Sequence, residues 1–408
     1  MKKRYLITIL FITIILAFPF YGQGQKKVAN TIPGVSEWHH GIYFWKSDDG
    51  RFAGRFDGRA FINGAYFFEN NFKDFSNGTH LRKARFSIKM LMWKNWYTEW
   101  DMDFANGAPE AKDMYISFLG FKNSYVKFGH FKVPFGLEIL TSSRYIPFPE
   151  RYYGALAFKM SRRVGFEYGR WGNNWNVRAS FFGQTMDGVK DKTNNETGGG
   201  FAARFAVAPI NNDNMILHLG ASAVWNRPDD ENWKEKFDAE PETKIGDYEI
   251  VKTPKIKDTN HDYRFGVEGA FVYRNFHLQG EYQMVNVYRN NNLPTAGFKS
   301  GYVYLLWDIN GGHRKWDNEQ GEFGQYLPNP ENKWGNWELA LRYSYVNLSD
   351  EDANVLGGVA ANYTAGINWY PNANMVWQLN YTYVQTSEHS KIGKDNFSYV
   401  QFMTKFFF

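Results

Sequence analysis

Apolar and polar residues alternate along most of this chain. From residue 51 onward, segments of roughly 8 to 14 residues show this pattern, and breaks rich in Gly, Asn, Asp and Pro separate them. In one late segment, Trp377 and Leu379 share one face, whereas Gln378 and Asn380 share the other. Such alternation predicts strands whose two faces meet different solvents.

The number and spacing of these segments predict an all-β transmembrane antiparallel β-barrel of about 16 strands. Their approximate centres are residues 60, 86, 100, 116, 127, 165, 178, 204, 219, 267, 281, 302, 341, 365, 379 and 402. Tight turns alternate with longer links such as 132–160 and 226–261, as in outer-membrane barrels with short periplasmic turns and long outer loops. The link 309–333 is an exception, because it lies on the tight-turn side and yet is long. A spanning sheet must close, since unpaired backbone groups in lipid are costly.

The composition agrees with a barrel. Aromatic residues make up 19% of the 408 residues, yet the mean hydropathy is −0.53. A polar chain with so many aromatic residues has to place them on a surface, as the aromatic girdles of barrels do. There is no cysteine, which excludes disulfides and thiolate chemistry. The chain ends in three phenylalanines, as bacterial barrels commonly end in phenylalanine.

The first residues predict export. Lys2, Lys3 and Arg4 precede an apolar run from Tyr5 to Phe18, which is shorter than the ~20 residues a spanning helix needs. We therefore expect a signal peptide at 1–25, an N-terminal periplasmic segment at 26–50 and the barrel at 51–408. Loss of the three basic leader residues lowers the formal charge from +5 to +2, which is too small to indicate nucleic-acid binding.

Several motifs resemble those of one family, the phosphate-selective porins O and P. These are its arginine-rich "LRRAR" strand, its "GQFKxPFGLE" element, its "TSS…ER" pair, its "GAWELxxRY" strand and its "GVNWY" motif. In this chain they correspond, in order, to His80–Phe86, Gly129–Glu138, Thr141–Arg144 with Glu150–Arg151, Gly335–Tyr343 and Gly366–Tyr370. The resemblance implies a homotrimer of sixteen-stranded barrels in the bacterial outer membrane, passing phosphate or similar anions. It also implies that the third long loop, 132–160, folds into the pore as a constriction.

Basic residues on the water-filled face are the candidates for an anion pathway, because selectivity needs charges inside a narrow tube. Strand alternation selects Arg51, Arg55, Arg59, Lys83, Arg85, Lys89, Lys127, Arg178, Arg204, Arg264 and Arg342. Arginine suits this role because its planar fork binds phosphate oxygens in pairs. The alternative is that lumen acids such as Glu99, Asp101 and Asp103 neutralise these bases.

The loop 132–160 supplies the candidates for the constriction itself. They are Lys132, Thr141, Ser142, Ser143, Arg144 and Arg151. Glu138 and Glu150 are candidates for holding the loop in place. Ile139 stands where the resemblance predicts a further basic residue, which weakens the case for strict phosphate specificity.

The amino-acid sequence leaves alternative functions open. The lysines of 226–261 are nearly balanced by acids, which favours a solvated surface loop. No HExxH or GxSxG pattern is present, so we expect neither an enzyme nor a bound cofactor or metal. A general diffusion porin is the main alternative, and a secreted, aromatic-rich glycan-binding β protein is the second.

Overall fold

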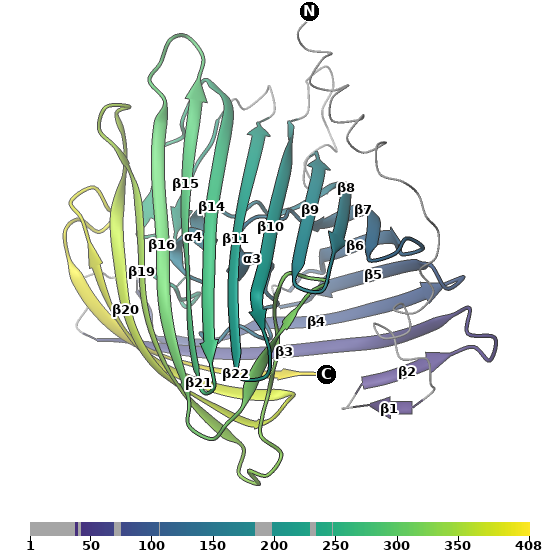
Figure 1. Cartoon of the computed structure of the whole chain (residues 1–408). Coiled ribbons are helices and arrows are strands. Elements are labelled where there is room, and N and C mark those ends of the chain that lie inside the picture. The colour runs from purple at the N-terminus through teal and green to yellow at the C-terminus, as the bar shows by residue number, and fades with distance from the viewer. Residues whose placement is uncertain are drawn as a thin grey trace, which may run out of the picture.

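Sixteen antiparallel strands close into one barrel (Figure 1). The computed structural model describes residues 37–39, 42–68, 75–105, 107–183, 198–228, 234–246 and 248–408. The barrel strands are β3 (Ala53–Phe68), β4 (Gly78–Met92), β5 (Trp96–Asp103), β6 (Glu110–Phe118), β7 (Ser124–Lys132), β8 (Arg162–Trp171), β9 (Trp175–Phe182), β10 (Gly199–Asn211), β11 (Met215–Arg227), β14 (Thr259–Tyr273), β15 (Phe276–Arg289), β16 (Ala296–Asp308), β19 (Asn336–Asp350), β20 (Val355–Asn372), β21 (Met375–Thr386) and β22 (Asn396–Phe407). Each of the sixteen expected strand centres falls within one of them.

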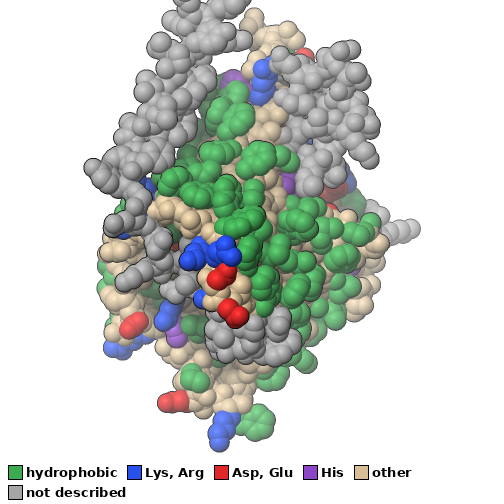
Figure 2. Space-filling view, turned by 90° about the vertical axis from the view of Figure 1, so that its right-hand side faces the viewer, with side chains coloured by type: hydrophobic (Ala, Val, Ile, Leu, Met, Phe, Trp, Pro, Cys, Tyr) green, Lys and Arg blue, Asp and Glu red, His purple; other side chains and the backbone are tan. Residues whose placement is uncertain are grey.

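The alternation seen in the sequence becomes an apolar outer wall and a polar lumen. Along β21, Trp377 and Leu379 are 44% and 48% exposed, whereas Gln378 and Asn380 are 1% and 3% exposed. Hydrophobic side chains cover much of the outer face in Figure 2. Such a surface is stable against hydrocarbon, where each backbone polar group must be paired within the barrel. In the described part of the chain, no helix has the length and apolar character needed to cross a membrane.

The barrel closes where the last strand meets the first barrel strand. β22 pairs with β3 from Ser398↔Phe68 to Phe407↔Arg59. The pairing continues one step further, because Gly58 and Phe408 exchange two backbone hydrogen bonds of 3.1 and 3.0 Å. A Cβ atom at Gly58 would lie 2.3 Å from the ring of Phe408. Glycine therefore makes room for the C-terminal aromatic ring.

A short hairpin precedes the barrel. It consists of β1 (Glu37–His39) and β2 (Ile42–Lys46), and β2 pairs with the first residues of β3 (Figure 1). This hairpin belongs to the segment 26–50 that we expected in the periplasm. The expected signal peptide, 1–25, lies outside the described residues.

Three connecting segments fold into the barrel. The constriction loop (133–161) contains α3 (Leu137–Leu140) and α4 (Tyr153–Ala157). The outer loop (228–258) contains β12 (Asp238–Ala239) and β13 (Val251–Lys252). The periplasmic hairpin (309–335) contains β17 (His313–Asp317) and β18 (Glu322–Leu327). The long link that broke the turn pattern in the sequence is thus a hairpin.

These segments pack on one side of the lumen. Residues of the constriction loop and the outer loop, among them Phe158 and Phe237, form one hydrophobic cluster with inward residues of β15, β16 and β19. In the periplasmic hairpin, Trp316 and Phe323 pack on β10, β11 and β14. The solvated surface loop expected at 226–261 is in part buried, since Phe237 and Ile250 are 1% and 0% exposed. Apolar packing therefore fills much of the lumen along β10 to β22, and residues of β3 and β9 contribute to it as well.

Candidate functional site

A charged cavity remains on the opposite side of the lumen, against β3 to β9. Its volume is ≈ 210 Å³, and its wall is completed by the constriction loop and the tip of the periplasmic hairpin. Nine basic side chains line it: Arg59, Lys83, Arg85, Lys127, Lys132, Arg144, Arg151, Arg162 and Arg178. Four acids line it as well: Glu99, Asp101, Asp113 and Glu322. The lining therefore carries a net positive charge.

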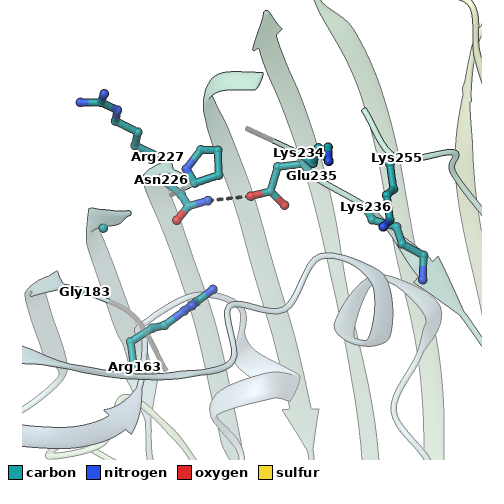
Figure 3. A pocket seen from close by; sticks show the side chains of 10 residues that line it. Arg163, Gly183, Asn226, Arg227, Lys234, Glu235, Lys236 and Lys255 are labelled. Carbon is teal, nitrogen blue, oxygen red and sulfur yellow. Dashed lines mark hydrogen bonds between the residues drawn. The ribbon is translucent and has the colours of Figure 1, made fainter. Parts of the chain in front are cut away.

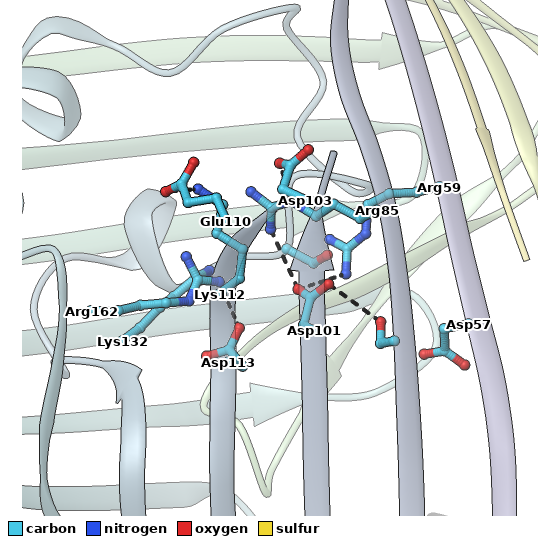
Figure 4. A network of polar contacts seen from close by, with 12 residues as sticks. Asp57, Arg59, Arg85, Asp101, Asp103, Glu110, Lys112, Asp113, Lys132 and Arg162 are labelled. Atoms are coloured by element: carbon cyan, nitrogen blue, oxygen red, sulfur yellow. Dashed lines mark hydrogen bonds and ion pairs between the residues drawn. The ribbon is translucent and has the colours of Figure 1, made fainter. Parts of the chain in front are cut away.

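Five of the nine bases have carboxylate partners within 4.0 Å. The network is drawn in Figure 4, where Arg85 and Arg162 point toward the acids of β5 and β6. The shortest distances are Arg85–Asp103 2.7 Å, Arg162–Asp113 2.6 Å, Lys127–Glu167 2.9 Å, Arg59–Asp101 3.5 Å and Arg144–Asp57 3.8 Å. The acids of β5 thus neutralise part of the positive charge of the lumen, which was the alternative considered in the sequence analysis.

The other four bases have no carboxylate oxygen within 4.0 Å among the described residues. Lys132 donates to the carbonyls of residues 139 and 140 at 2.9 and 2.8 Å. Arg151 donates to those of residues 138 and 141 at 2.8 and 2.7 Å. Arg178 binds the backbone and side-chain oxygens of Gln320 at 2.6 and 2.7 Å, and Lys83 lies 5.4 Å from the centre of the Phe61 ring. Neutral oxygens accept hydrogen bonds from Lys132, Arg151 and Arg178, and an aromatic ring faces Lys83, so that no adjacent carboxylate in the described part of the chain balances the charge of these four bases.

Two groups of the constriction loop, the Arg151 guanidinium and the Glu150 carboxyl, stay ionised although they are buried. Burial lowers the pKa of Arg151 to about 10, so this guanidinium stays charged at neutral pH. Burial also opposes ionisation of Glu150, but the adjacent Arg82 guanidinium outweighs it and lowers the pKa of that carboxyl to about 2. Glu150 accepts two hydrogen bonds from Arg82. The loop therefore presents a cation to the cavity and keeps an ionised anchor behind it.

Further contacts fix the loop to the barrel wall. Glu281 accepts the backbone N–H groups of Leu137 and Glu138 at 3.1 and 2.5 Å, at the start of α3. The Glu138 carboxylate accepts the N–H of Tyr152 at 2.9 Å, which joins the two ends of the loop. Both acids that the sequence suggested as anchors, Glu138 and Glu150, hold the loop.

Not every base selected from the sequence lies in the cavity. Of the eleven strand positions, five line it, and so do all the loop candidates except Thr141, whose hydroxyl donates to the carbonyl of Leu137 at 2.8 Å. The other six positions lie elsewhere. Three pair with acids toward the periplasmic end: Arg51 with Asp49, Arg55 with Asp57, and Lys89 with Asp57 and Glu99. The remaining three hold inserted segments through backbone carbonyls and acids: Arg204, Arg264 and Arg342.

Sequence reasoning missed several residues that matter here. Arg82 is turned inward by a bulge, since Phe61 pairs with Lys83 whereas Ile62 pairs with Leu81. Regular alternation would place Arg82 on the lipid face. Arg162 begins β8 directly after the constriction loop, where alternation gives no direction. A bulge leaves no reliable trace in one sequence, so the inward direction of Arg82 could not be assigned.

A second basic pocket lies at the outer mouth (Figure 3). Its volume is ≈ 270 Å³, and its lining includes Lys234, Lys236 and Lys255 of the outer loop. Glu235 lies among them and accepts a hydrogen bond from Asn226 at 3.1 Å. Burial, with a contribution from a nearby acid on β14, raises the pKa of Glu235 to about 7. Lysines that appeared balanced in the sequence are thus gathered at the entrance.

Comparisons with known proteins agree with this architecture. The model of the family "Phosphate-selective porin O and P" matches residues 55–408. Porin O of Pseudomonas aeruginosa is 24% identical over 353 residues, which are 78% of this chain and 77% of that protein. An uncharacterised protein of Caulobacter vibrioides is 26% identical over 258 residues, or 60% of this chain and 50% of its own length.

Solved structures share the fold at low identity. In-vitro folded OmpT of Vibrio cholerae aligns with a TM-score of 0.57 at 12% identity, covering 89% of this chain and 99% of that one. An anion-selective porin from Comamonas acidovorans aligns with a TM-score of 0.56 at 12% identity, covering 88% and 100%. The chain belongs to the phosphate-selective porin O and P family and is a porin of the bacterial outer membrane.

Proposed function

We propose that this porin passes phosphate and similar small oxyanions through the cavity beside β3 to β9. The observation that carries the proposal is the set of four cations without carboxylate partners among the described residues: Lys83, Lys132, Arg151 and Arg178. The cavity is smaller than the ~300–1,000 Å³ typical of pockets for drug-sized ligands, which favours a small ion. Membership of a phosphate-selective family points the same way.

Several weak binding sites, placed one after another along a pore, let an ion enter and leave quickly. We infer that an oxyanion moves from the lysines at the outer mouth to the cavity, where Arg151 offers a charged planar donor group. Ser142 and Ser143 line the same space and add neutral hydroxyl groups. The four lining acids lower the positive potential, so the ion is held loosely enough to be released.

General diffusion of small solutes is the second candidate. The same four acids favour it, because a lining of both signs discriminates less between ions. Ile139 is uncharged, whereas the resemblance to phosphate-selective porins predicts a basic residue at this position. The relatives are channels, and we infer that this chain likewise acts as a channel rather than as an enzyme.

Export and assembly complete the proposal. We infer that residues 1–25 act as a cleaved signal peptide and that the mature protein forms a homotrimer in outer-membrane lipid. A trimer form of Vibrio cholerae OmpT, which shares the fold at a TM-score of 0.55, supports a trimer here. N-terminal sequencing of the mature protein tests the first point, and migration on gels before and after heating tests the second.

Recording from purified protein in planar bilayers tests the ion preference. In a potassium chloride gradient, the reversal potential is expected to favour chloride over potassium. Added phosphate is expected to reduce the chloride current, because both anions compete for the same cations. A preference for potassium overturns the anion proposal. Anion preference without any effect of phosphate favours general diffusion instead.

A further inference from the structure

Lys405 is a buried cation with no acidic partner. It lies on β22, faces the lumen and is 1% exposed. Among the described residues no carboxylate oxygen lies within 4.0 Å of its ammonium group. Burying an amine group without hydrogen-bond acceptors is costly, so the acceptors around Lys405 indicate why it lies there. It does not line the cavity, which means that ion permeation alone does not explain it.

The contacts of Lys405 lie in the constriction loop. Its Nζ atom donates to the carbonyl oxygens of Ile146 and Phe148 at 2.9 and 3.3 Å. These carbonyls belong to the stretch Ile146-Pro147-Phe148-Pro149. Proline has no N–H group, so this stretch offers acceptors but cannot form a regular ladder. An ammonium group, with three donors and no acceptor, matches that set of acceptors.

Neighbouring strands contact the same stretch. Asn368 of β20 donates to the carbonyl of Pro147 at 2.8 Å, and Gln378 of β21 to that of Ile146 at 3.5 Å. Arg342 of β19 donates to the carbonyl of Glu150 at 3.0 Å. The last four strands of the barrel thus each hold one part of 146–150. Among these donors, Lys405 is the one on the strand that closes the barrel.

We propose that Lys405 is a positioning residue of the pore, which locks residues 146–148 of the constriction loop to the closing strand and so fixes the width of the cavity. Arg144 and Arg151 flank the locked stretch and line the cavity. The ring of Phe61 lies near both Lys405 and the cavity-lining Lys83, with its centre 5.6 Å from Nζ of Lys405 and 5.4 Å from Nζ of Lys83.

Three variants test the lock. Lys405→Met removes the donor and the charge while keeping the length of the side chain. Asn368→Leu removes a donor to the same stretch without changing the charge. Lys299→Met is the matched control, because this lysine is exposed on the outer face of β16 and lies outside the constriction loop. Heat-modifiable migration on gels first establishes that each variant folds, and unit conductance and current noise are then recorded in potassium chloride.

Lys405→Met and Asn368→Leu are both expected to raise the unit conductance, about twofold for the lysine variant, and to add flickering substates, because a loosened loop widens the narrow segment. Lys299→Met is expected to match the wild type. The rival explanation is that Lys405 acts only through its charge. In that case Lys405→Met shifts the reversal potential, whereas Asn368→Leu leaves the conductance and the current noise unchanged. This combination of results refutes the lock. Should Lys405→Met not fold, a silent Asn368→Leu refutes it equally.

This inference rests on the pore of the proposed function but not on its ion preference. Conductance and noise report the width of the pore whichever ion carries the current. A wild-type channel that prefers potassium overturns the proposed function and leaves the lock intact, whereas quiet, unchanged currents in both variants overturn the lock alone.

Discussion

Replacing Lys83 by methionine is expected to weaken the binding of a permeating anion about tenfold. Lys83 lines the cavity, is 6% exposed and has no carboxylate oxygen within 4.0 Å in the described part of the chain. Its charge therefore acts on an anion without local cancellation. A unit charge ~5 Å away contributes about 3 kcal/mol at an effective dielectric constant of ~20 and about 1 kcal/mol in water. A tenfold effect, ~1.4 kcal/mol, lies near the lower end of that range, as a water-filled cavity requires.

Lys89→Met is the matched control for this change. Lys89 lies on the same strand and the same face, but its ammonium is 2.8 Å from Asp57 and 3.5 Å from Glu99, and it does not line the cavity. The two lysines are about 20 Å apart along β4, at ~3.4 Å per residue. That separation exceeds the Debye length of ~8 Å at physiological ionic strength. The control is thus expected to change anion binding less than about twofold.

The assay is the block of chloride current by phosphate in planar bilayers, measured for the wild type and both variants at the same ionic strength. The phosphate concentration that halves the current should rise for Lys83→Met and stay nearly constant for Lys89→Met. Equal shifts in both variants would show that total lumen charge sets the affinity, and the argument from local pairing would then be wrong.

Two structural changes and one pH effect extend the same reasoning. Gly58→Leu forces a side chain against the ring of Phe408 and is expected to reduce the fraction of barrels that close, as judged by heat-modifiable migration. Arg82→Met removes the guanidinium that lowers the pKa of the buried Glu150 carboxyl to about 2, so this pKa is expected to rise and the currents to become noisy at a higher pH than in the wild type. Trp316→Phe removes a 3.0 Å hydrogen bond that anchors the periplasmic hairpin, worth about 1 kcal/mol, and is expected to raise conductance.

Each of these changes has its own control. Gly78→Leu introduces the same side chain into open space and should close normally. In the wild type, the contribution of Glu150 is present above pH 4.5 and is lost only as the pH falls through about 2, so its currents should stay quiet at pH 4. Closure of Gly58→Leu at wild-type yield, noise in the wild type at pH 4, or unchanged conductance in Trp316→Phe would each contradict the corresponding argument.

Much of the fold was predictable because a membrane barrel repeats one local rule. Period-two alternation is set by lipid on one side and water on the other, so each strand carries its own signal. Trp377 and Gln378 are assigned to opposite faces without any knowledge of their neighbours. The same rule fails at the bulge beside Lys83, where one extra residue turns Arg82 inward.

The site was less predictable because its geometry depends on residues far apart in sequence. Arg178 was identified as a lumen base, but its partner is Gln320, in a link whose role the sequence left open. Likewise, Glu242 pairs with Arg342 at 2.6 Å from a loop that appeared solvated. Alternation fixes the face on which a side chain lies, but it does not fix which inserted segment meets that side chain.

This distinction changes what the lumen arginines do. Arg204, Arg264 and Arg342 each donate to a backbone carbonyl of an inserted segment, at residues 321, 158 and 150, respectively. A guanidinium group has five donors and no acceptor, so it can bind an acid and a carbonyl at the same time. On the β10–β22 side these arginines therefore support the segments that narrow the pore. On the β3–β9 side Arg178 also holds an inserted segment, through Gln320, but it lines the cavity together with Arg59 and Arg85, so that its charge also acts on an anion. A substitution of a lumen arginine has to be interpreted by whether its side chain lines the cavity, holds an inserted segment, or does both.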